Sequence, residues 1–187
     1  GETIPTANIP ADPFKEGYAF DGWFNGETRF DFNAPVTAGG TYEAVFTQLF
    51  TVAFVNGEET VASFSVRAGE TVPADSIPGD LPSTEEFQFV GWFSGETEFD
   101  DLAPVTDNVV YSARFERIAF ALTFGETVVY VPVSDPVLSA EDIPGAPAGN
   151  GVFLGWYCDG VKAEAGITVT ENAAYEAVFV TEADYLG

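Results

Sequence analysis

The chain has 187 residues, and 30 acidic residues against 6 basic ones give it a formal net charge of -24. Such a charge repels phosphate backbones and anionic lipid, which excludes nucleic-acid binding. No stretch approaches the roughly 18 apolar residues of a membrane span, so no membrane insertion is expected in this segment. The chain has no histidine and a single cysteine, Cys158. A Cys–His catalytic pair, a histidine zinc site and an internal disulfide are therefore excluded.

The motif Phe-x-Gly-Trp-aromatic occurs three times and divides the chain into similar units. It holds all three tryptophans and lies at residues 20–24, 89–93 and 153–157. In each unit a closing phenylalanine follows the tryptophan by the same interval, at Phe46, Phe115 and Phe179. Similarity at a regular period indicates a repeat array.

The first unit begins part-way through the repeat. Residues 1–5 match residues 69–73, so the first unit lacks the hairpin that precedes this point in the second. A loop at 25–28 follows Trp23, and residues 42–46 alternate apolar and polar side chains, as expected of a half-buried closing strand.

The second unit shows the whole repeat. Residues 51–55 and 61–67 are predicted to form a hairpin about the turn signal Asn56-Gly57. Residues 74–78 are long enough for one helical turn before a proline stops it. The closing strand is predicted at residues 111–115.

The third unit follows the same plan with different residues. Its hairpin strands are predicted at 118–123 and 128–133, its helical turn at 139–144 and its closing strand at 175–179. The Phe-Asp and Ala-Pro pairs that follow the first two tryptophans are missing from it.

The predicted organisation is therefore a tandem array. Residues 1–48 form a partial repeat without its opening hairpin, and residues 49–116 form a complete repeat. Residues 117–180 form a complete, divergent repeat, and residues 181–187 form a tail or the start of a further strand. Short linkers at 47–49 and 116–117 are expected to hold neighbouring repeats in near-fixed orientation.

Taken together, these elements resemble the Listeria–Bacteroides repeat, the type found in the B-repeat region of internalin B. The shared pattern is Phe-x-Gly-Trp-aromatic, an upstream Gly-x-x-Val-Pro, a downstream Pro-Val-Thr and a closing Tyr-x-Ala-x-Phe. The resemblance implies a small β-grasp-like (ubiquitin-like) fold in each repeat, a twisted mainly β or α+β sheet with one short helical turn. It also implies secretion to a bacterial cell surface, with no catalytic residues.

Side chains that could carry chemistry are better explained by structure. The Gly-Trp motif could stack a carbohydrate, but its fixed frame favours a core position. The carboxylate pairs are expected to be solvated, because adjacent strand residues point to opposite faces and no spaced calcium loop is present. These pairs are Glu58-Glu59, Glu85-Glu86, Asp100-Asp101 and Glu141-Asp142. We predict no catalytic, cofactor or metal site.

Three smaller signals have ordinary interpretations. Cys158 is expected to be packed or incidental, with intermolecular pairing as the alternative. Residues 81–84 read Leu-Pro-Ser-Thr, like the start of a sortase signal, but lie mid-chain without the following glycine. An isopeptide bond would have only Lys15 and Lys162 available.

The leading hypothesis is a non-enzymatic extracellular stalk, spacer or adhesion array whose partners are neighbouring repeats of the same or an adjacent chain. A second is a filament subunit joined by strand donation into the incomplete first repeat. A third is a module that binds a host or cell-surface protein or glycan through the loose aromatics Phe50, Tyr130 and Tyr185.

Overall fold

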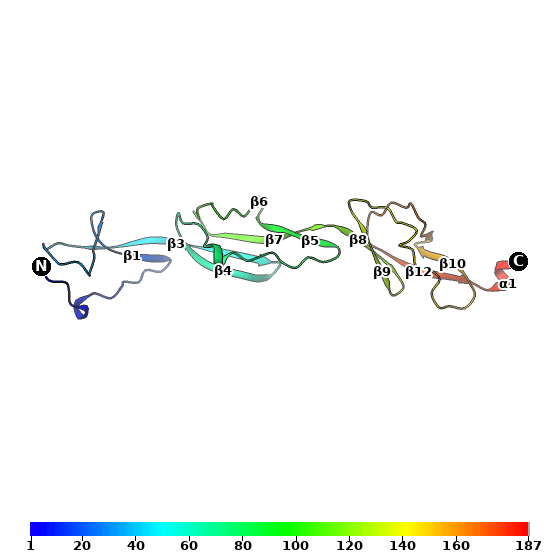
Figure 1. The fold of residues 1–187 in the computed structure, drawn as a ribbon, viewed down its shortest axis with the longest axis horizontal. Helices are drawn as coiled ribbons and strands as arrows, with labels where there is room; N and C mark the ends of the chain where they lie inside the picture. The colour runs from blue at the N-terminus through cyan, green and yellow to red at the C-terminus, as the bar shows by residue number, and fades with distance from the viewer. Residues whose placement is uncertain (187) are drawn as a thin grey trace. The chain divides into compact units, whose positions relative to one another are not determined.

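The computed structural model describes residues 1–186, and β-strands make up most of their regular structure (Figure 1). The mainly β class expected from the alternating segments is confirmed. The chain divides into two compact units, one of Gly1–Gly79 with Gly91–Ala113 and one of Asp80–Val90 with Arg114–Gly187. This division does not follow the repeats, because the second repeat contributes to both units.

The first sheet carries the first two repeats. Its strand order is β2-β1-β3-β7-β5-β6, with β4 paired to β3. The strands are β1 (Tyr18–Asn25), β2 (Thr28–Arg29), β3 (Glu43–Asn56), β4 (Glu59–Arg67), β5 (Phe87–Ser94), β6 (Thr97–Glu98) and β7 (Val109–Arg117). β3 is antiparallel to β4 and parallel to β7. The opening hairpin predicted for the second repeat is therefore confirmed.

β3 belongs to two repeats at once. Its first residues pair with β1 and close the first repeat, and its later residues pair with β4 and open the second. The linker predicted at residues 47–49 is thus part of one unbroken strand.

The second sheet carries the third repeat in the order β11-β10-β12-β8-β9. Its strands are β8 (Ala119–Phe124), β9 (Thr127–Pro132), β10 (Val152–Cys158), β11 (Val161–Lys162) and β12 (Ala173–Val180). β8 is antiparallel to β9 and parallel to β12, which repeats the pairing of β3 with β4 and β7. The divergent third copy therefore keeps the strand arrangement of the second.

The predicted helical turns appear as single 3₁₀ turns in two repeats only. They are η1 (Thr6–Asn8) and η2 (Ala74–Ser76), each directly after a proline. In the third repeat Asp142 N–H donates to Ser139 O (3.3 Å) and the Ser139 hydroxyl donates to Asp142 (2.6 Å). The predicted helical turn at 139–144 is therefore a single hydrogen-bonded turn, and no helix is formed there. The tail forms a short helix, α1 (Glu182–Leu186), and not a strand.

The Phe-x-Gly-Trp motif is a β-bulge. The pairing of β1 with β3 shifts between Phe20 and Gly22, and that of β10 with β12 shifts between Phe153 and Gly155. Residues three apart in a regular strand point to opposite faces, and one extra residue brings them to the same face. Phe20 accordingly meets Trp23, with ring centroids 5.7 Å apart, and the third copy has the same contact at 5.9 Å. The bulge explains the spacing of the motif.

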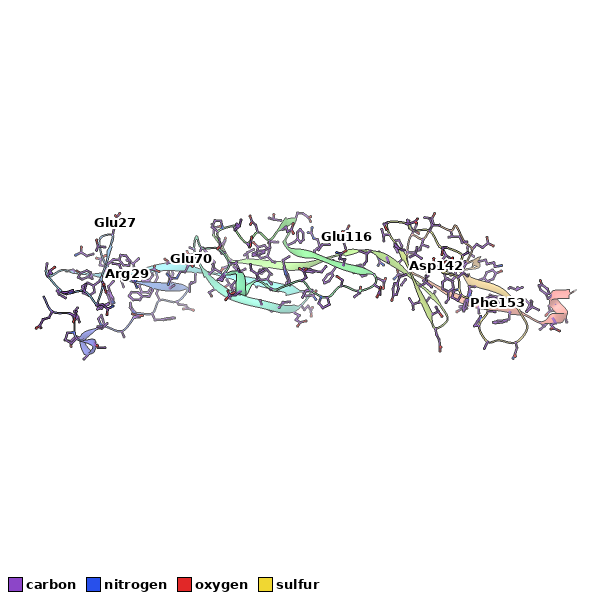
Figure 2. All side chains as sticks on the ribbon, viewed as in Figure 1. Glu27, Arg29, Glu70, Glu116, Asp142 and Phe153 are labelled. Carbon is purple, nitrogen blue, oxygen red and sulfur yellow. The ribbon has the colours of Figure 1, made fainter. Side chains whose placement is uncertain are left out.

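Glycine is required in the bulge for two reasons. The φ angles are +135° at Gly22, +141° at Gly91 and +141° at Gly155, a region that other residues avoid. The side chain seven residues later also lies over the glycine. A Cβ on Gly22 would come within 2.6 Å of the Arg29 side chain, which Figure 2 labels, and a Cβ on Gly155 within 2.6 Å of Lys162.

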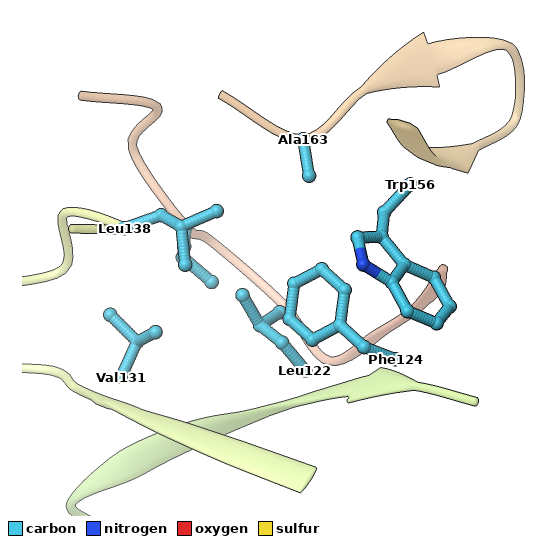
Figure 3. Packing of buried hydrophobic residues seen from close by; sticks show 7 residues of the cluster. Leu122, Phe124, Val131, Leu138, Trp156 and Ala163 are labelled. Carbon is cyan, nitrogen blue, oxygen red and sulfur yellow. The ribbon is translucent and has the colours of Figure 1, made fainter. Parts of the chain in front are cut away.

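The complete repeats have matching cores. In the third repeat the buried cluster contains Leu122, Phe124, Val131, Leu138, Trp156, Ala163 and Val169 (Figure 3). The corresponding buried side chains of the second repeat are Val52, Phe54, Val66, Val72, Trp92 and Val105. Ala163 replaces Phe99, and the larger Leu122 and Leu138 replace Val52 and Val72, so volume lost at one position is regained at others.

Replacing Gly155 by alanine should destabilise the third repeat by about 1–3 kcal/mol, because a Cβ there forces both a strained φ and a clash with Lys162. Urea unfolding monitored by tryptophan fluorescence measures the effect. Gly145→Ala is the matched control, since a Cβ at Gly145 meets no atom of the described chain within 4 Å. Equal stabilities of the two variants would contradict the assigned role of the bulge.

Candidate functional site: the open groove of the first repeat

The first repeat contains an open apolar groove where the other repeats have a core. The groove has a volume of about 410 Å³. Its walls include Ile4, Pro10, Trp23, Phe30, Val36 and Tyr42. None of the buried apolar side chains found in residues 1–186 belongs to this repeat. The three segments that form the walls are the N-terminal segment, the bulged strand β1 with the loop after β2, and the residues before β3.

The backbone around the groove is formed as in the complete repeats. Val36 N–H donates to Glu2 O (2.9 Å), as Val105 N–H donates to Glu70 O (2.8 Å). Phe30 N–H donates to Trp23 O (2.7 Å), matching the bond from Phe99 to Trp92 (2.8 Å). The scaffold of the first repeat is therefore in place even though its interior is open.

In the complete repeats one phenylalanine of the opening strand fills this space. Phe54 of β3 is fully buried and lies 5.3 Å from Trp92 and 5.5 Å from Tyr111, measured between ring centroids. Phe124 of β8 repeats this packing at 5.6 Å from Trp156 and 4.8 Å from Tyr175.

The first repeat has the receiving rings but no such phenylalanine. Phe30 packs instead on Phe32 and Tyr42, at 4.8 and 4.6 Å between ring centroids. Val36 is 38% exposed, whereas its counterpart Val105 is 8% exposed.

The indole of Trp23 also differs from the corresponding indoles of the complete repeats. Trp92 Nε1 donates to Pro78 O (3.3 Å) and Trp156 Nε1 donates to Pro144 O (2.8 Å). Trp23 Nε1 is buried and has no hydrogen-bond partner within residues 1–186. The proline in the corresponding place, Pro10, lines the groove. A buried donor without an acceptor costs free energy, and buried donors in folded proteins normally form a hydrogen bond.

The closing strand of the first repeat also starts late. β7 begins at Val109 and β12 at Ala173, where each pairs with the opening strand of its own repeat. The corresponding residue of the first repeat is Gly40, but β3 begins only at Glu43. The three residues before Glu43 thus lie at an edge that in the other repeats is covered by a parallel strand.

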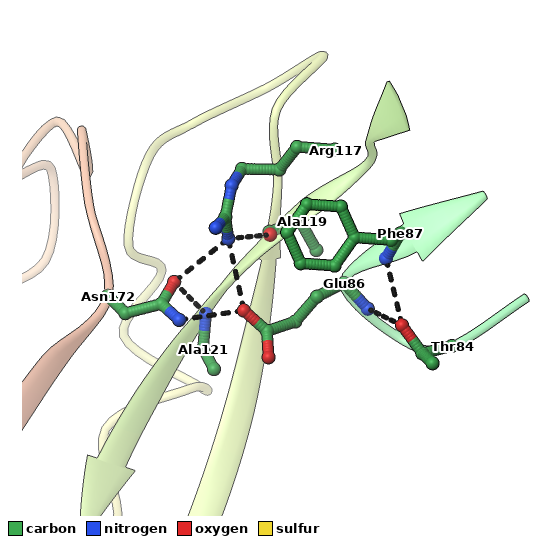
Figure 4. Close-up of polar contacts among 7 residues, drawn as sticks. All are labelled: Thr84, Glu86, Phe87, Arg117, Ala119, Ala121 and Asn172. Atoms are coloured by element: carbon green, nitrogen blue, oxygen red, sulfur yellow. Dashed lines mark hydrogen bonds and ion pairs between the residues drawn. The ribbon is translucent and has the colours of Figure 1, made fainter. Parts of the chain in front are cut away.

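Two arginines connect successive repeats. Arg67 of β4 donates to Asp21, the extra residue of the first bulge, and Thr47 Oγ1 donates to the other carboxylate oxygen of Asp21 (2.7 Å). Arg117, at the end of β7, donates to Glu86 Oε1 (3.0 Å) and to Asn172 Oδ1 (3.1 Å) (Figure 4). Two of the 6 basic residues of the chain therefore lie at contacts between successive repeats.

Glu86 holds the second of these clusters together. It accepts from Asn172 Nδ2 (2.7 Å) and from Arg117 (Figure 4). The hydrogen bond from Asn172, supported by the hydrogen bond and charge of Arg117, lowers the pKa of the Glu86 carboxyl below its ordinary value. Asn172 also accepts from Ala121 N–H (3.1 Å), and Asn108 accepts from Thr51 N–H (2.7 Å) in the second repeat. An asparagine thus anchors each opening strand.

The core position predicted for the tryptophans is confirmed for Trp92 and Trp156, which are 5% and 4% exposed. Trp23 is partly buried in the wall of the groove. Of the carboxylate pairs, Glu86 and Asp142 are half-buried and hydrogen-bonded, and the other members are exposed.

The remaining candidates have local structural roles. Thr84 of the Leu-Pro-Ser-Thr segment accepts from Phe87 N–H (3.0 Å) and shapes the start of β5. Lys15 Nζ lies 3.5 Å from the ring centroid of Tyr18, and Lys162 covers the bulge. Cys158 is half-buried. The loose aromatics lie on three different elements: Phe50 on β3, Tyr130 on β9 and Tyr185 on α1.

Sequence reasoning missed the clusters around Asp21 and Glu86. The scarcity of basic residues was one available signal, since an arginine kept in so acidic a chain suggests a specific carboxylate partner. The matching positions of Asn108 and Asn172 in their repeats were another. Within residues 1–186, no helix is long and apolar enough to cross a membrane, and no group of three or more acidic or cysteine side chains is placed to hold a metal ion.

Comparison with known proteins gives a matching family model and relatives that include two proteins of one bacterium. The family model of the Listeria-Bacteroides repeat domain matches residues 2–42 and 50–113. A protein of Evansella cellulosilytica named "Putative membrane protein" is 29% identical over 170 residues, which cover 83% of this chain and 25% of that protein. A "Putative Gly-rich membrane protein" of the same organism is 28% identical, with 83% and 19% covered. The chain thus spans a quarter or less of these relatives. No solved structure matches it significantly.

Glu86→Gln should lower stability at pH 7, and the deficit should shrink on acidification. A lowered folded pKa means that Glu86 contributes stability above the unfolded pKa, near 4.5, and loses it as the pH falls through the folded value. Urea unfolding of both proteins at pH 7, 5, 4 and 3 measures the difference. Glu85→Gln controls for the loss of one negative charge from an exposed neighbour. A deficit that stays constant with pH would contradict the assignment.

Proposed function

Because the chain belongs to the Listeria-Bacteroides repeat family, we propose that it is a non-enzymatic repeat module of a bacterial surface protein that acts as a stalk or spacer. Both relatives are named as membrane proteins, and each is several times longer than the part that this chain matches. A short array carried within a long surface protein is consistent with a spacing role outside the cell.

We also propose that each complete repeat is β-grasp-like. The supporting feature is the strand order of the second repeat, β4-β3-β7-β5, in which the opening hairpin leads and the closing strand lies parallel to its first strand. The third repeat has the order β9-β8-β12-β10, with the same parallel pair. Short turns between hairpin and bulged strand take the place of the longer helix of such folds.

The observation that carries the spacer proposal is the continuity of β3. A spacer must resist bending where one repeat meets the next, and a strand hydrogen-bonded on both sides of the boundary does this through its backbone. β3 pairs with β1 before residue 49 and with β4 from residue 49 onward. The contact of Arg67 with Asp21 crosses the same boundary through side chains. The residues of the Phe-x-Gly-Trp motif, by contrast, make their ring contacts inside their own repeats.

The filament hypothesis is not favoured in its original form. Strand donation by the tail requires residues 181–187 to be available as a strand, and the structure has the helix α1 at Glu182–Leu186. Glycan binding through the loose aromatics has no supporting geometry either, since they lie on separate elements. The open groove of the first repeat is the more specific feature.

The spacer proposal predicts a stiff boundary between the first two repeats. Spin labels on cysteines replacing Glu27 and Glu58, in the exposed turns β1–β2 and β3–β4, should give a narrow distance distribution by double electron–electron resonance. Cys158→Ser removes the native thiol. Inserting Gly-Ser-Gly-Ser after Gln48 should broaden the distribution strongly.

The control for this measurement is the same insertion after Gly79, which lies outside the region between the labels. It should leave the distribution narrow. A broad distribution in the protein without any insertion would contradict a stiff boundary and remove the main support for a spacer.

A further inference from the structure

We propose that Asn150 is a site of spontaneous covalent modification, at which the side-chain amide is lost and the backbone is rearranged to an isoaspartyl linkage. The reactants are the chain itself and water, so the reaction requires no partner and no cofactor. The inference concerns only the loop before β10 and does not depend on whether the array acts as a spacer.

The reaction needs an asparagine followed by a glycine whose backbone nitrogen is free to attack. That nitrogen loses its proton to a base in the solvent and forms a bond to Cγ of the asparagine, and the side-chain nitrogen leaves as ammonia. Water then opens the resulting succinimide ring at either carbonyl, which gives aspartate or isoaspartate. Glycine favours the attack because it has no side chain to block it, and asparagine is one of the thermolabile residues of proteins.

The chain contains this pair three times, at Asn25-Gly26, Asn56-Gly57 and Asn150-Gly151. All of these residues are exposed, so access to water does not distinguish the three sites. Backbone hydrogen bonding does distinguish them, because the asparagine must rotate its backbone to bring Cγ to the glycine nitrogen.

The first two pairs lie in hairpins that oppose this rotation. Asn25 is the last residue of β1 and pairs with Thr28 across a tight turn. Asn56 is the last residue of β3 and pairs with Glu59 in the same way. Rotation would break the closing pair of each hairpin, so the reaction there requires local opening, which slows it about tenfold.

The third pair lies in the loop between β9 and β10, where no such restraint exists. Neither Asn150 nor Gly151 belongs to a strand, and neither forms a hydrogen bond within residues 1–186. Rotation of the Asn150 backbone therefore breaks no hydrogen bond, and the attacking nitrogen of Gly151 is free.

The amide at this position is restrained in the other two repeats. Tyr18 N–H donates to Lys15 O (3.1 Å), and Phe87 N–H donates to Thr84 Oγ1 (3.0 Å). In the third repeat an alanine stands in place of this threonine, and it has no hydroxyl to accept the bond. The free amide of Gly151 is thus a specific property of the third repeat.

The rearrangement at Asn150 would disturb a close contact with β12. An isoaspartyl residue adds one methylene group to the backbone, and both of its neighbours are packed tightly. A Cβ on Gly149 would clash with the ring of Phe179, and a Cβ on Gly151 would clash with Val180 O. A longer backbone does not fit here without shifting these contacts. Because β10 begins at the next residue and pairs there with Val180, the shift should loosen the pairing of β10 with β12.

The test is incubation of the full chain at pH 8 and 37 °C, followed by unfolding, digestion with trypsin and mass spectrometry. Cleavage after lysine and arginine places the three pairs on separate peptides, residues 16–29, 30–67 and 118–162. In the folded protein the amide at Asn150 should be lost about tenfold faster than those in the hairpins. In concentrated urea the three rates should be similar, because the hairpins are then open.

Asn150→Gln is the matched variant, because glutamine keeps the amide but would have to form a larger ring. It should remove the fast phase of ammonia release, whereas Asn25→Gln should leave that phase unchanged. Equal rates at Asn150 and Asn25 in the folded protein would overturn the assignment. A rate at Asn150 that rises in urea as much as the rate at Asn25 would overturn it too.

The effect on β10 is measured by hydrogen exchange of the modified protein. Isoaspartate at position 150 should speed amide exchange in β10 and β12 about tenfold. Asn150→Asp is the control, since it carries the same charge on a backbone of normal length, and it should leave exchange unchanged. Equally slow exchange in the isoaspartyl protein and in this control would refute the loosening of β10.

Discussion

The packing of one phenylalanine from the opening strand between the tryptophan and the tyrosine of the same repeat is the contact on which each complete repeat depends. Phe54 and Phe124 each touch the bulged strand and the closing strand at once. A repeat of about 65 residues buries little surface, so a single ring that joins three strands contributes a large part of its core. The bulge, the parallel strand pair and the proline contact of the indole all serve to present or cover this ring.

The first repeat shows what remains when that ring is absent. Its turns, bulge and backbone bonds form without it, because they depend on local sequence and on β3. What is lost is burial: the tryptophan loses its acceptor, Val36 is more exposed than Val105, and the closing strand shortens. In repeat proteins each unit relies on its neighbours to cover part of its apolar surface. The groove is such a surface.

Charge has a separate role in this chain. Most of the acidic side chains are solvated, and the few basic ones hold particular positions: Lys15, Arg29, Arg67, Arg117 and Lys162 each contact a ring, a glycine or a carboxylate. Long side chains such as these cover apolar or backbone surface with their stems while their charged ends reach polar partners. A net charge of -24 also favours electrostatic repulsion between copies of the chain.

Much of the fold could be predicted because its signals are local and repeated. The hairpin about Asn56-Gly57, the alternating closing strands and the core tryptophans all follow from short sequence patterns. The helical turn predicted at residues 139–144 was wrong, since that segment forms a single hydrogen-bonded turn closed by Asp142 N–H and Ser139 O. The boundary at residues 47–49 was taken as a linker, since composition does not show that one strand serves two repeats.

The sequence by itself determined that the chain is a repeat array, that a glycine precedes each tryptophan and that residues 1–5 match residues 69–73. These depend on residue identity and spacing along the chain. Only the tertiary structure decided that the first repeat has an open apolar groove, that Trp23 Nε1 has no acceptor within residues 1–186 and that Asp21 and Glu86 each bind an arginine. Those features join residues far apart in sequence, and their partners are fixed by strand register, which spacing along one chain does not reveal.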